Sequence, residues 1–180
     1  MPDPSLIKSS TEDALHRLQR FLTNNRRLTF VSCWNASEHE SHALWRIYCP
    51  TSEGVAIQTT FACLEKSVAP LDVLEVTCNP HELDNILNPY KLATQKRPMF
   101  AYEQEVRVVL HQNLTDPEHP DRITYGTGIP WNLEEHIENI WIHPEAQHWF
   151  AETVTQIVSH LSPKLAHQVW YSKMNTSPPF

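Results

Sequence analysis

The sequence predicts an α+β fold, as a single domain with a mixed, mostly antiparallel sheet packed by helices. The chain has 180 residues, which suits one domain. Hydrophobic residues make up 41% of it, enough for a core that six Trp and six Phe enlarge. Strand-like and helix-like segments mix without a strict β-α-β-α order, which favours antiparallel pairing. We therefore expect one domain over 1–180, with flexible ends at 1–9 and 175–180.

Helices are predicted from capping residues and apolar stripes. A cap at Ser10 or Thr11 precedes a stripe that includes Leu18 and Phe21. Ser37, with Glu40 three residues later, forms a capping box for a second helix. In chain order, helices are expected from Ser10 or Thr11 to Asn24, and over 38–48, 61–67, 80–87, 133–136 and 145–161.

Strands are predicted where β-branched and apolar residues alternate between turn signals. A polar loop over 88–98 and a turn-rich connection over 113–121 separate the later segments. The strands are expected over 28–33, 55–59, 71–77, 103–111, 122–125, 137–142 and 167–171.

Charge and hydropathy exclude several classes of function. The net charge of -7 argues against a broad nucleic-acid surface. No apolar run approaches the roughly 20 residues that a membrane helix needs. The N-terminal residues lack the basic and apolar parts of a signal peptide, so we expect a cytoplasmic protein.

Cysteine, glycine and histidine patterns exclude further sites. The four cysteines form no C-x-x-C pair, which indicates reduced, buried thiols. With three glycines the chain has no glycine-rich phosphate loop. His39 and His42 are three residues apart, whereas zinc peptidases need a spacing of four, so we expect no metal site there. Trp141, Trp149 and Trp170 are interpreted as core residues, because little basic charge accompanies them.

The strongest chemical pattern lies at the start of the strand over 103–111. Alternate residues of a strand share a face, so Glu103, Glu105 and Arg107 should point the same way. Such a row either binds a charged ligand or forms a structural ion-pair ladder near Lys96 or Arg97. The sequence leaves both interpretations open.

Three segments together resemble a bacterial family known only as a domain of unknown function, of the 2971 type. They agree with it in order and spacing over nearly the whole chain from about residue 28. The resemblance implies little chemistry, but related families are associated with abortive phage resistance. The segments are 30–34 with 40–48 and 54–57, Lys96 with 100–107, and 137–144 with 149–150 and 171–172.

The Glu-x-Glu pattern is also similar to the signature of many ADP-ribosyltransferases. That similarity implies NAD as a substrate, with no tightly bound cofactor and no metal. Glu105 would stabilise the oxocarbenium charge, Glu103 would orient the acceptor, and Arg107 would support both. The residues expected to hold the cofactor are Ser32, Trp34, Trp45 and Tyr48.

The alternative is a non-catalytic module of a defence system that binds a protein or a nucleotide. Two arrangements of Glu105 distinguish these hypotheses. An enzyme should place Glu105 at the base of a cleft lined by Ser32, Trp34 and Tyr48. A binding module should bury Glu105 in a satisfied salt bridge.

Overall fold

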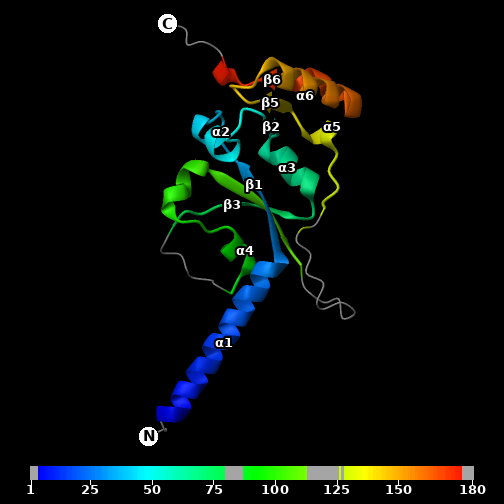
Figure 1. Ribbon diagram of the computed structural model, residues 1–180. Coiled ribbons are helices and arrows are strands. Elements are labelled where there is room, and N and C mark those ends of the chain that lie inside the picture. The colour runs from blue at the N-terminus through cyan, green and yellow to red at the C-terminus, as the bar shows by residue number, and fades with distance from the viewer. Residues whose placement is uncertain (1–3, 80–86, 113–125, 127, 176–180) are drawn as a thin grey trace. The chain divides into compact units, whose positions relative to one another are not determined.

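The computed structural model describes residues 4–79, 87–112, 126 and 128–175 (Figure 1). The chain forms two compact units, the first from Met1–Trp34 and Leu71–Gly128 and the second from Asn35–Pro70 and Ile129–Phe180. Each unit contains one three-stranded sheet with helices. The predicted α+β class and the mainly antiparallel pairing are therefore confirmed, and the strands are divided between two sheets.

The first unit is built around β4, the central strand of its sheet. The sheet order is β1-β4-β3, and β3 pairs antiparallel with β4, with Asp72 opposite Val109 and Glu75 opposite Val106. Val106, Val108 and Val109 are buried. The elements are α1 (Pro4–Leu28), β1 (Thr29–Asn35), β3 (Asp72–Glu75), α4 (Pro89–Ala93), the 3₁₀ helix η1 (Pro98–Glu103) and β4 (Glu105–His111).

The start of β1 lies beside the end of β4. Thr29 Oγ1 is 2.9 Å from His111 Nδ1, and the Gln112 amide donates to the Leu28 carbonyl. These contacts show that β1 and β4 run antiparallel.

The second unit has the sheet order β2-β5-β6. β2 pairs antiparallel with β5, and β6 pairs parallel with it. Ile137, Ile140 and Leu165 form a buried cluster against which Val158 of α6 packs. The elements are α2 (His42–Tyr48), β2 (Val55–Gln58), α3 (Phe61–Val68), α5 (Leu133–His136), β5 (Asn139–Ile142), α6 (His148–Leu161), η2 (Pro163–Gln168), β6 (Val169–Tyr171) and η3 (Lys173–Asn175).

Several predicted boundaries need correction. α1 begins at Pro4, so much of the segment expected to be loose is helical; proline suits a first helical position. α2 begins at His42, because Ser41 and not Ser37 accepts the hydrogen bond of a first-turn amide. The expected polar loop over 88–98 contains α4, whose N-terminus the Asn88 side chain caps.

Some predictions lie outside the described residues. These are most of the helix over 80–87, the strand over 122–125 and the tail beyond Asn175. Among the described helices, none combines the length and the apolar character needed to cross a bilayer.

Candidate functional site: an acid–base network on β4

Glu103 and Glu105 meet through a break in the backbone and not through strand alternation. Glu103 ends η1, and Gln104 has a positive φ of 40° before β4 begins at Glu105. The predicted strand over 103–111 is therefore two residues too long at its start. Lys96 joins the two carboxylates, because its Nζ lies 2.6 Å from Glu103 Oε2 and 2.5 Å from Glu105 Oε2.

Arg107 binds Glu105 from the same face of β4, as strand alternation predicts. Its Nε lies 2.7 Å from Glu105 Oε1, and its second terminal nitrogen donates to Glu105 Oε2 at 3.2 Å. A further guanidinium nitrogen donates to the carbonyl of Ala93, the last residue of α4. This two-pronged geometry is the strong form of an arginine–carboxylate pair. It also ties α4 to the central strand.

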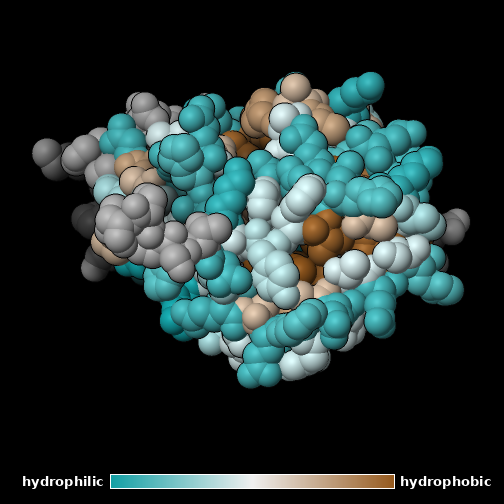
Figure 2. Space-filling model, turned by 90° about the horizontal axis from the view of Figure 1, so that it is seen from above, coloured by the Kyte–Doolittle hydropathy of each residue, from teal (hydrophilic) through white to brown (hydrophobic). Residues whose placement is uncertain are grey.

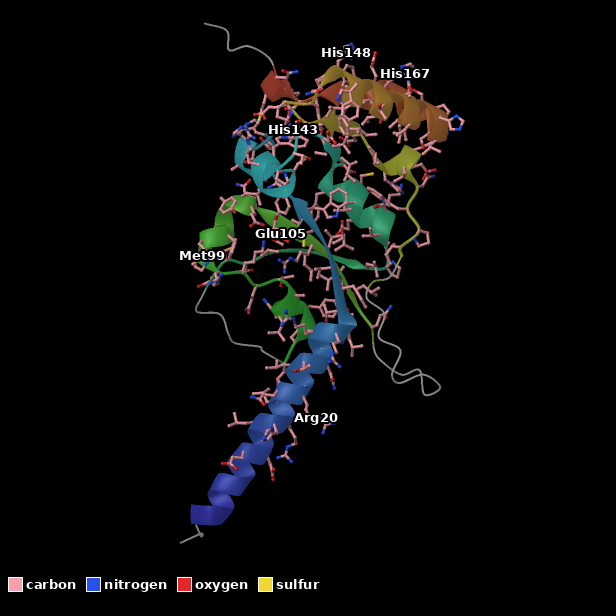
Figure 3. All side chains as sticks on the ribbon, in the orientation of Figure 1. Arg20, Met99, Glu105, His143, His148 and His167 are labelled. Carbon is pink, nitrogen blue, oxygen red and sulfur yellow. The ribbon has the colours of Figure 1, made fainter. Side chains whose placement is uncertain are left out.

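The network is largely shielded from solvent. The Glu105 side chain is 5% exposed, and those of Glu103 and Arg107 are 9% and 14% exposed. Val106 and Val108, on the other face of β4, are also buried. Both faces of this strand are therefore covered, and Figure 3 labels Glu105 at this position within the first unit.

The ion pairs determine the charge state of the network. Burial alone would raise the pKa of Glu105, but hydrogen bonds from Arg107, Cys33 and Lys96 lower that pKa to about 2. Burial would likewise lower the pKa of Lys96, and its two carboxylate partners raise it instead. Glu105 is thus an anion at neutral pH.

Cys33 of β1 borders the network. Burial raises the pKa of this thiol, and the neighbouring Glu105 carboxylate raises it further. A nucleophilic cysteine needs the opposite shift, so Cys33 is a poor nucleophile. The prediction of buried thiols was wrong: Cys33 is exposed, and Cys49, Cys63 and Cys78 are half-buried.

The predicted cofactor residues are divided between the two units. Ser32 and Trp34 contact each other in the first unit, where Trp34 Nε1 donates to Ser32 Oγ at 3.1 Å. Trp45 and Tyr48 belong to the second unit. Trp45 is buried, as expected of a core residue, which leaves no free ring face for nicotinamide. Tyr48 is 67% exposed.

The sequence reasoning missed a second polar cluster, centred on Glu40 in the second unit. Glu40 Oε2 accepts hydrogen bonds from Trp45 Nε1 and from Ser172 Oγ, at 3.1 and 2.6 Å, and Oε1 accepts one from the Lys173 amide. Glu40 was interpreted as half of a capping box, a local role that hid its contacts with Ser172 and Lys173, far along the chain. The cluster connects the start of α2 to the end of β6.

His143 lies at the edge of this second cluster. It is 2% exposed, and its ring meets that of Trp45 edge to face at 5.1 Å. Its Nδ1 accepts a hydrogen bond from the Glu145 amide, while Nε2 has no partner among the described residues. His143 therefore serves mainly to seal the second unit beside Trp45.

The surface of the second unit carries a shallow hollow. It lies between α6 and β6 and has a volume of about 310 Å³. In the view from above, apolar residues reach the surface between polar ones (Figure 2). None of the residues predicted for the active site lines the hollow; its lining is His148, Ala151, Glu152, Thr155, Gln156 and Tyr171.

Metal binding finds no support in the part of the chain that the structure describes. No group of three or more His, Cys, Asp or Glu side chains there has the arrangement of a metal site. The nearest approach to such chemistry is a pair, Cys63 Sγ at 3.5 Å from His136 Nδ1.

The two family resemblances rest on the sequence segments that suggested them. Neither the α+β class nor the Glu105 network identifies a family by itself. No protein-family model matches this chain, and no match to it was found among curated proteins or among solved structures.

Proposed function

We propose that this protein is a non-catalytic protein-binding module in which the Glu105 network is a structural clamp. One observation carries the proposal: Arg107 and Lys96 occupy both carboxylate oxygens of Glu105, whose side chain is 5% exposed. A carboxylate that stabilises an oxocarbenium ion must face the reacting sugar. Glu105 faces two cations of its own chain instead.

The energetics also argue against ADP-ribosyl transfer. NAD would reach Glu105 only by displacing Arg107 or Lys96. Separating one partner from a buried ion pair typically costs about 3–5 kcal/mol. That cost would be added to the barrier of the reaction, whereas active sites hold their charges ready for the transition state.

Exposed tryptophans support binding of a protein partner. Trp149 and Trp170 are each 51% exposed, which corrects their interpretation as core residues. Trp170 is the register partner of Trp141, so both indoles emerge on one face of the second sheet. Tryptophan is enriched at protein interfaces and among their energetically dominant residues. A role in phage defence stays a prediction of the family resemblance.

The test is incubation of the purified protein with NAD. We expect no release of nicotinamide by chromatography and no heat of binding by calorimetry, with a known ADP-ribosyltransferase as the positive control. Nicotinamide release that Glu105→Gln abolishes, while circular dichroism shows an intact fold, would establish the transferase instead. Binding of NAD without turnover would replace the protein-binding proposal with the nucleotide-binding one.

A further inference from the structure

α1 presents an apolar stripe that the described residues cover only in part, since Leu18 and Leu22 are half-buried and Leu15 and Phe21 are exposed. The helix has 25 residues, so it is about 37 Å long. None of the described elements packs extensively against it. Leu15 is 55% exposed and Phe21 is 40% exposed. A helix of this length in water normally needs tertiary or quaternary contacts on its apolar face.

The stripe has the spacing of a coiled coil. Leu15 and Leu22 are seven residues apart and take the a positions of a heptad repeat, with Leu18 at the d position between them. Phe21 extends the stripe on one side, at a g position. The helix can therefore offer a narrow seam to another helix.

The charged residues beside the seam favour antiparallel over parallel pairing. Glu12, Gln19 and Arg26 are seven residues apart and take successive e positions on the other flank. In an antiparallel pair of identical helices, e positions face e positions, so Glu12 meets Arg26 of the second copy twice and Gln19 meets Gln19. The sequence of this flank is thus complementary to its own reverse.

Two of the three leucines fit the same register, and Leu15 falls level with Asn25 of the second copy. When Glu12 lies beside Arg26 of the second copy, Leu18 comes level with Leu22 of that copy, and Leu22 with its Leu18. The two Phe21 rings meet on the opposite flank. Parallel pairing offers no such match, because it would set Phe21 against Arg26 and Ala14 against Gln19.

We infer that α1 pairs antiparallel with α1 of a second copy of this chain. The interface is isologous, with two Leu18–Leu22 contacts in the seam and two Glu12–Arg26 ion pairs related by the two-fold axis. The inference goes beyond the proposed function and does not rest on it, since self-association and NAD turnover are measured separately.

The first experiment measures mass as a function of concentration by sedimentation equilibrium. The full chain should show twice the 20.9 kDa of one copy, and Leu18→Asp should shift it to a monomer. Circular dichroism of Leu18→Asp establishes that the remaining fold is intact. A monomer at every concentration of the unsubstituted chain would overturn the inference, as would a dimer that Leu18→Asp leaves unchanged.

Charge reversal tests the orientation. Glu12→Arg alone and Arg26→Glu alone should each weaken the dimer by roughly tenfold, because each places like charges together twice. The double variant should restore the dimer, since the pairs are re-formed with opposite sign. Failure of the double variant to restore it would refute antiparallel pairing.

Arg20→Glu is the matched control. It makes the same change of charge as Arg26→Glu, but Arg20 is exposed at the f position, away from the seam (Figure 3). The dissociation constant should stay within about twofold of the unsubstituted chain. A tenfold loss in Arg20→Glu would show that net charge, and not the proposed pairing, governs association.

Discussion

The central strands of the two sheets both bury apolar side chains, but β4 adds a covered ion-pair network. β4 carries Glu105 and Arg107 in a covered strand, paired with each other and with Lys96. β5 buries Ile140 and Ile142 and is followed by the buried His143 against Trp45. Apolar burial contributes stability directly, whereas a buried ion pair roughly offsets its own desolvation and mainly specifies which groups must meet. The first unit thus adds charge pairing to its buried valines to fix its geometry, whereas the central strand of the second unit is held by apolar area.

The largest expected effect is in the second unit. Trp45→Ala should lower the free energy of unfolding by about 3–5 kcal/mol, as for other buried aromatic residues. The indole is 8% exposed, packs against His143 and donates to Glu40, so its loss leaves a cavity and removes one hydrogen bond to Glu40. Urea denaturation followed by circular dichroism measures the change.

Trp149→Ala is the control for Trp45→Ala. Trp149 is 51% exposed, so its removal should change the free energy of unfolding by less than about 1 kcal/mol. Equal effects of the two substitutions would mean that the second unit does not depend on the apolar contacts described for it.

The next effect is in the first unit. Arg107→Met should lower the free energy of unfolding by about 3 kcal/mol, because it leaves the buried Glu105 carboxylate with Lys96 alone. Combining it with Glu105→Gln should cost less than the sum of the two single changes, since no unpaired charge then remains. Urea denaturation of the three variants measures this coupling.

Arg46→Met provides the matched control for Arg107→Met. The Arg46–Glu145 pair is about half exposed on both sides, and such surface pairs contribute about 0–1 kcal/mol. If the two arginine substitutions had equal effects, the Glu105 network would not be the clamp that distinguishes the first unit.

The smallest effect on the free energy of unfolding is expected from lowering the pH. The folded-state pKa of Glu105 is about 2, against an ordinary value of 4.5. Because the folded value is the lower one, this stabilisation is fully present above pH 4.5 and is lost as the pH falls through 2. Urea denaturation from pH 6 to pH 3 should show this loss of stability in the unsubstituted chain and not in Glu105→Gln. A pH dependence that is equal in both would assign the acid sensitivity to other carboxylates.

Much of the site was predictable from neighbouring residues. Strand alternation put Glu105 and Arg107 on one face, and the structure pairs them. The ion-pair interpretation also named Lys96, which the structure places between the two carboxylates. The role of Glu103 was not predictable in the same way, because the left-handed Gln104 takes Glu103 out of the strand.

The tryptophans show more clearly what the sequence could not predict. The composition made all six tryptophans candidates for the core, yet Trp45 is buried and Trp170 is half exposed. Their local sequences do not distinguish them, since burial depends on which distant segment covers each indole. The ring of His143, which follows β5, packs against Trp45, a contact that no local pattern encodes.

The amino-acid sequence determined the local features of this protein: the α+β class, the alternation along β4 and the heptad spacing of α1. Each of these depends on residues within one or two turns or strand repeats. Tertiary structure decided how the strands divide into two sheets, which carboxylates lie buried and which tryptophans face solvent. Those outcomes depend on contacts between segments that lie far apart in the chain, and the free energy of burial acts only when such segments meet.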